Sequence, residues 1–197
     1  GGLGLDLLFA TVVSEALGGG VGPTSFIAPY VMAPTAIIHP GNAEQKEKYL
    51  TLLTANEIQF GVGFTEFVGK RNDAGVTYDE GLLNGRAMFV LDVLNATHFL
   101  LADEQGQIFV VDAKSSNIEI VNLTTVDKTR TYAEIICRNT NAELLESSKE
   151  SKEPIQKAID AGRIMLAADS VGASQTMLDR AVDYAKERKQ FGRVIGS

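Results

Sequence analysis

The sequence predicts an α+β protein of more than one domain, with N-terminal helices, a central antiparallel β-barrel or sandwich, and a long C-terminal helix from an incomplete helical bundle. Apolar residues recur at helical spacing early in the chain. β-branched and aromatic residues with closely spaced turn signals follow, and helix-forming residues dominate the end. The expected domain ranges are 1–56, 57–143 and 144–197.

Composition restricts the function classes. The chain has 197 residues, of which 45% are hydrophobic and 22% charged, as in ordinary globular proteins. The net charge of −7 argues against a nucleic-acid partner, because only the last residues form a basic cluster. The single cysteine, Cys137, excludes an internal disulfide and fits a reducing cytoplasm, and we expect it buried and inert. Residues 26–38 are apolar but interrupted by prolines and too short for a bilayer, so we expect no membrane span.

Three helices are expected in the N-terminal part. The first starts at a cap, Asp6, and ends at a run of three glycines. The second covers roughly residues 23–38 and is kinked by its prolines. The third starts at Asn42, which forms a capping box with Gln45. The apolar faces consist of Leu5, Leu8, Phe9, Val12, Val13 and Ala16 in the first helix, and of Tyr49, Leu50 and Leu53 in the third.

From residue 58 onward the pattern is that of short strands joined by tight turns, which is typical of a small barrel or sandwich. The expected strands are 58–64, 75–78, 82–90, 98–102, 108–112, 118–123 and 132–138.

A polar linker at 141–153 leads to one long helix. Pro154 suits its first turn, and the helix can run to about Gln190, a length of roughly 50 Å at ~1.5 Å per residue. Burying its apolar side requires partner helices. That side carries Ile155, Ile159, Gly162, Leu166, Leu178, Ala181, Val182 and Ala185.

The basic residues at the end of this helix have two explanations. Lys186, Arg188, Lys189 and Arg193 lie where the helix dipole favours cations, which requires no ligand. They also form part of a longer motif, which gives the second explanation.

Four stretches resemble the acyl-CoA dehydrogenase family, and the resemblance covers nearly the whole chain. They read GGLGLDLL, GNAEQKEKYLTLLTANEIQFGVGFTE, LLNGRAMFVLD and YAKERKQFGRVIGS. The resemblance implies FAD bound between subunits of a homo- or hetero-oligomer, a dimer or tetramer. It also implies oxidation of fatty acyl-CoA, as in β-oxidation, to the trans-2-enoyl product, with an electron-transfer flavoprotein or similar protein as acceptor.

On the flavin-ring side, the resemblance assigns four cofactor positions. Phe64 and Thr65 match strand positions near the pyrimidine edge of the flavin, and Phe89 matches an aromatic residue that packs on the ring. Leu91 stands where the family commonly has a Ser or Thr that bonds flavin N5. The alternative is that Phe64 and Thr65 belong to an ordinary half-buried strand and that Phe89 is part of the core.

Five further positions follow from the same comparison. Arg188 matches the arginine that meets the FAD pyrophosphate of the adjacent subunit, with Gln190 and Phe191 beside it. Asp160 and Arg163 match positions facing the acyl-CoA substrate, although their spacing also suits a plain ion pair within the helix.

The sequence departs from the family in several places. Phe67 replaces a usual proline, and a Gly-Ser-Asp loop that contacts flavin phosphate is absent. The family's catalytic carboxylate is expected beyond Ser197, in a chain lacking both ends, and we interpret Glu66 as structural. His39 and His98 are isolated, so no metal site is expected.

Three functions therefore stay open: an acyl-CoA dehydrogenase, here incomplete and inactive alone; a non-catalytic partner subunit that completes a neighbour's FAD site; and a scaffold without cofactor. Leu91 and the missing Gly-Ser-Asp loop favour the second.

Overall fold

The computed structural model describes residues 4–69 and 71–196 and has the predicted α+β architecture. By packing, the chain divides into two compact units. One comprises the described residues up to Gly22 and those from Arg163 onward, and the other is Pro23–Gly162. The three domain ranges expected from the sequence stay a prediction.

The first unit pairs α1 (Leu7–Gly19) with the later part of α5 (Glu153–Glu187). As predicted, Asp6 caps α1, because its carboxylate accepts hydrogen bonds from the amides of Leu8 and Phe9. The buried residues of α1 are the small ones, Ser14 and Gly18. The predicted apolar face is instead exposed, with Leu8 73% exposed. Small side chains allow the closest approach of two helix backbones, so they form the contact.

The helices of the second unit are η1 (Ala28–Met32), α2 (Ala33–Ile38) and α3 (Ala43–Thr54). The prediction of one helix over 23–38 was wrong at its start, because residues 23–26 are not helical. Two prolines lack the amide hydrogen that an α-helix needs, and η1 is a π-helical turn. The capping box of Asn42 and Gln45 on α3 is confirmed.

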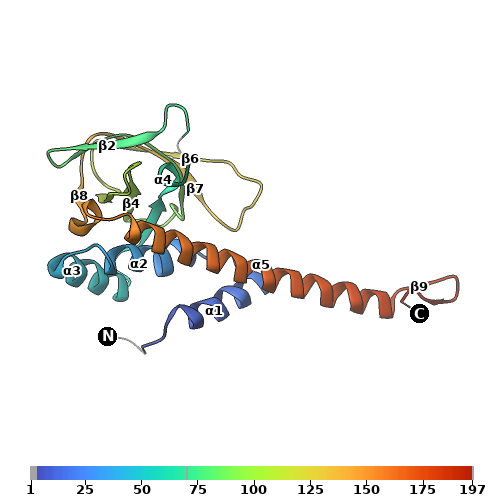
Figure 1. Ribbon diagram of the computed structural model, residues 1–197. Coiled ribbons are helices and arrows are strands. Elements are labelled where there is room, and N and C mark those ends of the chain that lie inside the picture. The colour runs from blue at the N-terminus through green and yellow to red at the C-terminus, as the bar shows by residue number, and fades with distance from the viewer. Residues whose placement is uncertain (1–3, 70, 197) are drawn as a thin grey trace. The chain divides into compact units, whose positions relative to one another are not determined.

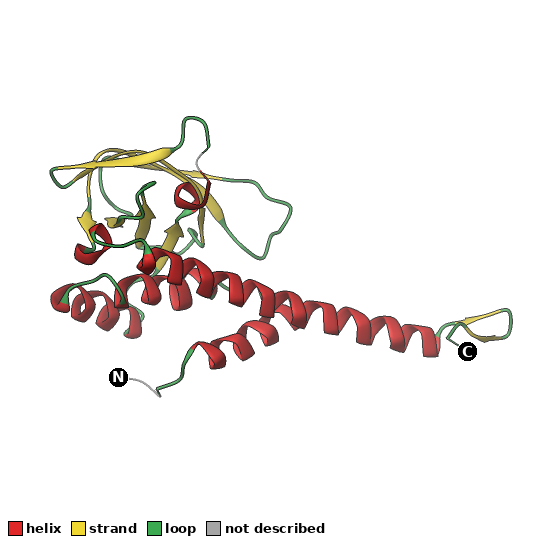
Figure 2. Cartoon of the chain, viewed as in Figure 1, coloured by secondary structure: helices red, strands yellow, loops and turns green. Residues whose placement is uncertain are grey.

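Eight strands hydrogen-bond into one sheet, in the order β6-β7-β3-β1-β4-β5-β8, with β2 paired to β3. The pairs are antiparallel except β1 with β4, which is parallel. Figure 2 shows these strands curving around one another in the second unit. The strands are β1 (Phe60–Gly63), β2 (Gly75–Asp79), β3 (Leu82–Leu91), β4 (His98–Ala102), β5 (Ile108–Asp112), β6 (Ile118–Asn122), β7 (Tyr132–Asn141) and β8 (Glu143–Leu144).

Two hydrophobic clusters stabilise the second unit. One lies between strands and includes Leu83, Val90, Phe99, Phe109 and Ile135. The other joins the opposite side of β1, β4 and β5 to the helices and to the first turns of α5, and Figure 1 shows α2 and α3 beside this part of the sheet. Its members include Ala33, Ile37, Tyr49, Leu53, Phe60, Leu100, Ile108 and Ile155.

The segment expected as a polar linker is packed. It contains β8, which pairs with β5, and a 3-10 turn, η2 (Glu146–Lys149). Leu145 is fully buried, because this segment completes the helix-facing cluster. The long helix itself is confirmed, but its predicted stripe is buried only at the start: Ile155 and Ile159 are covered, whereas Leu166 and Leu178 are exposed.

Within the described ranges, no helix combines the length and the apolar character required to cross a bilayer.

Candidate flavin-binding site

Two segments distant in sequence meet where strands β1 and β3 end, and they carry four of the predicted cofactor residues. The last residues of β1 lead into α4 (Thr65–Gly69), and the last residues of β3 lie beside them. Val62 pairs with Leu91, and Glu66 Oε1 accepts a hydrogen bond from the amide of Met88 at 2.8 Å. The fold therefore brings residues 64–65 close to residues 89–91. We call this region the β1–β3 edge.

Two of the four positions differ from the expected strand geometry. Strand β1 ends at Gly63, so Phe64 follows it and Thr65 begins the helix α4. This turn into α4 places the Glu66 carboxylate within hydrogen-bonding distance of the Met88 amide. The Phe64 side chain is buried in the helix-facing cluster, which leaves its backbone for any ligand contact. The side chain of Thr65 is half-buried.

Phe89 is neither core nor ordinary strand. Its φ of 56° lies in the left-handed region, and its side chain is 37% exposed. The pairing of β3 with β7 shifts between Ala87 and Val90, which makes Met88 and Phe89 the residues of a β-bulge. The Arg71 guanidinium carbon lies 4.9 Å from the centre of the Phe89 ring. An aromatic ring that is partly exposed at a bulge is available to stack on a planar ligand.

Leu91 is half-buried and packs against the helix-facing cluster. Its side chain offers no hydrogen bond, as the sequence indicated. The next residue, Asp92, was not singled out from the sequence. It is 4% exposed, its Oδ2 accepts a hydrogen bond from the Ala28 amide at 3.3 Å, and burial raises its pKa. The signal that could have identified it is an acidic residue directly after an apolar strand.

In the first unit, Gln190 and Phe191 lie on a small hairpin after α5, and Arg188 lies between α5 and this hairpin. The hairpin consists of β9 (Lys189–Gln190) and β10 (Arg193–Val194). Phe191 and Gly192 form the turn with φ values of 50° and 81°, and the Phe191 side chain is fully exposed. Both backbone groups of Arg188 are hydrogen-bonded: its amide donates to the Tyr184 carbonyl, and its carbonyl accepts from the Ile195 amide. Its side chain reaches solvent.

Asp160 and Arg163 lie on α5, and both are exposed. Asp160 accepts a hydrogen bond from the Gln156 side chain at 2.9 Å. Their assignment to substrate stays a prediction.

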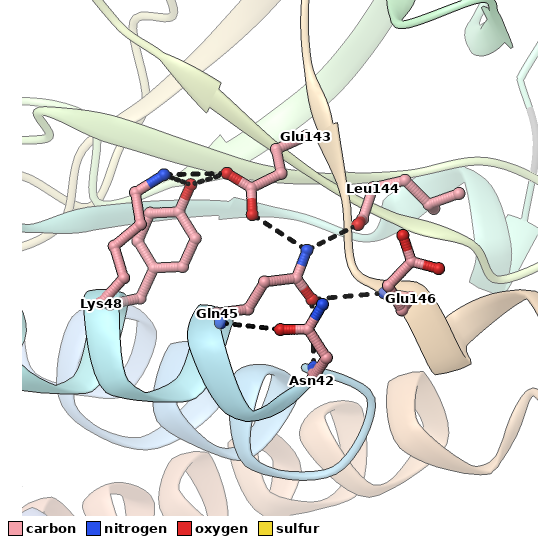
Figure 3. A network of polar contacts seen from close by, with 7 residues as sticks. Asn42, Gln45, Lys48, Glu143, Leu144 and Glu146 are labelled. Atoms are coloured by element: carbon pink, nitrogen blue, oxygen red, sulfur yellow. Dashed lines mark hydrogen bonds and ion pairs between the residues drawn. The ribbon is translucent and has the colours of Figure 1, made fainter.

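A separate cleft of about 1110 Å³ lies between α3, β5 and β8, and none of the predicted site residues is among the described residues that line it. Figure 3 shows the polar network at this cleft. Glu143 accepts hydrogen bonds from Tyr49 at 2.7 Å and from Lys48 and Gln45 at 2.9 Å each. Although burial opposes ionisation, these bonds lower the pKa of Glu143, and burial raises the pKa of Tyr49 to about 12. The network ties α3 to β8, which is a structural role.

The β1–β3 edge partly fits a flavin. The Phe89 ring and the Thr65 hydroxyl suit a planar heteroaromatic ligand, whereas Leu91 supplies no hydrogen bond to it.

Comparisons with known proteins agree with these features. Residues 1–57 match the family profile described as acyl-CoA dehydrogenase, N-terminal domain, and residues 153–197 match the one described as acyl-CoA dehydrogenase, C-terminal domain. The chain is 30% identical to the caffeyl-CoA reductase-Etf complex subunit CarC of Acetobacterium woodii and, likewise, 30% identical to the 3-(aryl)acrylate reductase of Clostridium sporogenes. Each match covers 99% of this chain and 57% of the relative, so the chain spans little more than half the length of these relatives.

Among solved structures, the butyryl-CoA dehydrogenase from Megasphaera elsdenii superposes with a TM-score of 0.82 at 21% identity, over 98% of this chain and 56% of that one. At this identity the likeness concerns the fold.

Proposed function

We propose that this chain, which belongs to the acyl-CoA dehydrogenase family, is the part of an FAD enzyme that holds the flavin while the Cα–Cβ bond of an acyl-CoA thioester is oxidised to the trans-2-enoyl product. Members of the family are FAD flavoproteins and oxidoreductases acting on CH–CH bonds. The observation that carries the proposal is the β1–β3 edge, where an aromatic ring at a left-handed bulge stands beside the Thr65 segment.

When bound, FAD supplies the hydride acceptor for this chemistry. In the proposal, the Phe89 ring packs on the flavin and keeps water from one side of it. The Thr65 hydroxyl and the backbone around Phe64 orient the pyrimidine edge. Leu91 offers only an apolar contact. None of these residues removes the substrate's Cα proton, so the base lies elsewhere in the protein.

The hairpin contributes the second part of the cofactor site. Arg188 carries a guanidinium that can bond two phosphate oxygens at once, and its backbone is already fixed by hydrogen bonds. We assign it to the FAD pyrophosphate of an adjacent subunit, with Gln190 and the exposed Phe191 beside it. This assignment requires an oligomer.

Substrate and partners belong to the same proposal. We assign Asp160 and Arg163 to the acyl-CoA substrate.

Because a 30% identical relative is named as a subunit of a reductase-Etf complex, we propose an electron-transfer flavoprotein as redox partner. The reductase names of both relatives also make the reverse direction, reduction of an enoyl thioester, a reaction to test. We propose a cytoplasmic location from the lone, buried cysteine.

The test uses the full-length protein. We expect it to bind FAD near stoichiometrically, and the yellow colour to bleach when an acyl-CoA is added. Arg188→Gln should weaken FAD binding roughly 10- to 100-fold, because a hydrogen bond to a charged group contributes about 1.5–3 kcal/mol. Arg180→Gln, which changes an exposed arginine on α5, is the matched control and should leave FAD binding unchanged. Equal affinity in wild type and Arg188→Gln would refute the pyrophosphate assignment.

Leu91 favours a second function, a non-catalytic partner subunit, because the chain lacks a side-chain hydrogen bond at that position. This function predicts colourless protein that binds flavin only when mixed with a homologous subunit. Flavin bound by the purified protein alone would exclude it.

A further inference from the structure

A buried carboxylate holds the bulge that presents Phe89. Glu66 on α4 is 3% exposed, and its Oε1 accepts the Met88 amide hydrogen at 2.8 Å. Between Ala87 and Val90 the sheet register shifts, because Met88 and Phe89 of β3 lie opposite the single residue Glu134 of β7. A bulge takes an amide out of the sheet ladder, and the half-buried amide of Met88 then needs another acceptor. Glu66 is that acceptor.

The bulge forces Phe89 into a conformation that a bulky residue rarely adopts. Its φ is 56°, and such backbone persists only where the surroundings fix it. Such strain is concentrated at functional sites. The Glu66–Met88 hydrogen bond fixes the amide of the residue directly before Phe89.

The second carboxylate oxygen of Glu66 indicates that this residue has a role besides stabilising the fold. Oε2 is buried and has no hydrogen-bond partner among residues 4–69 and 71–196. Such a group costs free energy that an apolar side chain of similar size would avoid. Glu66 keeps a carboxylate where only one of its oxygens is used for the fold.

We propose that Glu66 is a positioning residue: by fixing the Met88–Phe89 bulge, it sets the orientation in which the Phe89 ring meets the flavin. The inference rests on the proposed function and deepens it, because it extends the cofactor site to a residue that contacts no ligand itself.

The test compares Glu66→Leu and Glu66→Gln in the full-length protein. Hydrogen exchange of the Met88 amide is measured without flavin, and FAD affinity is measured by reconstitution of the flavin-free protein. Glu66→Leu should expose the Met88 amide to exchange and weaken FAD binding roughly 2- to 12-fold, the range expected for losing one aromatic stacking contact. Glu66→Gln should keep both properties, because its amide oxygen still accepts the hydrogen bond.

Asp103→Asn is the matched control. Asp103 is also a buried carboxylate that accepts hydrogen bonds from backbone amides, those of Gln105 and Gln107, but it lies in the turn between β4 and β5. The control should leave Met88 exchange and FAD affinity unchanged. If Glu66→Leu does not fold, Glu66→Asp provides the same comparison, because its shorter side chain does not reach the Met88 amide.

A double-mutant cycle with Phe89→Ala separates positioning from general stability. If Glu66 acts through Phe89, adding Glu66→Leu to Phe89→Ala causes no further loss of FAD affinity. Additive losses, or full FAD affinity after Met88 protection is lost, overturn the inference. A wild-type protein that binds no FAD instead refutes the proposed function, and Met88 exchange in Glu66→Leu then still decides whether the carboxylate holds the bulge.

Discussion

Replacing Gly172 by alanine tests how α1 packs on α5 in the first unit. A Cβ at Gly172 would lie 1.9 Å from the Glu15 carbonyl oxygen, and a Cβ at Gly18 would lie 2.0 Å from the Asp169 carbonyl oxygen. Both obstacles are backbone atoms, which cannot rotate away. In Gly172→Ala the two helices must separate until the first distance exceeds 3.0 Å, the lower limit for real Cβ contacts.

The expected cost follows from the contacts that this separation disturbs. The Ser14 hydroxyl donates to the Met165 carbonyl at 2.8 Å, and the Thr176 hydroxyl donates to the Gly19 carbonyl at 3.0 Å. Overpacking costs about 1–3 kcal/mol, and each lost hydrogen bond adds about 1 kcal/mol. The net expectation is that docking of α1 weakens by about 3–5 kcal/mol.

The assay is hydrogen exchange of the α1 amides, which should lose most of their protection in Gly172→Ala while amides of β3 and β7 keep theirs. Gly162→Ala is the control on the same helix. There the new Cβ meets the Met32 sulfur at 2.7 Å, and that side chain is flexible enough to move. Wild-type protection of α1 in Gly172→Ala, or equal damage from both variants, would refute the packing argument.

Three further predictions concern single residues. The pKa of Glu143 is lowered in the folded protein, so its ionised form contributes stability that is complete above the pKa of the unfolded chain and is lost at lower pH. The difference in unfolding free energy between wild type and Glu143→Gln, measured by urea denaturation, should therefore be present at pH 7. It should disappear as the pH falls below 4.5. Asp6→Ala should reduce the protection of the α1 amides by about 1 kcal/mol in the same hydrogen-exchange assay, because the hydrogen bonds from two backbone amides to the Asp6 carboxylate are lost. Burial raises the pKa of Cys137 to about 11, so a thiol reagent at pH 8 should modify it only after unfolding.

Local features of the fold could be predicted from the sequence because they depend on neighbouring residues. The Asp6 cap, the capping box at Asn42 and the long helix after Pro154 all follow from a few adjacent side chains. The face that each helix buries could not be predicted in the same way. On α1 the apolar residues indicated one face, but the contact uses Ser14 and Gly18, because close approach to α5 depends on residue size across two distant segments.

The same distinction applies to the β1–β3 edge. The resemblance indicated which residues to compare, and the fold places Phe64 and Thr65 close to Phe89 and Leu91. The helical position of Thr65 and the bulge at Phe89 were not predictable. Both lie where Glu66 reaches a backbone amide 22 residues later in the chain, and no local pattern encodes such a contact.

The end of β3 is held from two sides by carboxylates instead of by the sheet ladder alone. Glu66 accepts a hydrogen bond from the Met88 amide, and Asp92 accepts one from the Ala28 amide. The backbone is left-handed at Phe89 and at Asp92, with φ values of 56° and 61°. Burial raises the pKa of both acids. Their raised pKa values mean that ionising them weakens the fold as the pH rises, so they are a cost to stability at neutral pH. If only stability mattered, apolar residues would suit these two positions better. The cost therefore indicates that this segment serves to present the Phe89 ring.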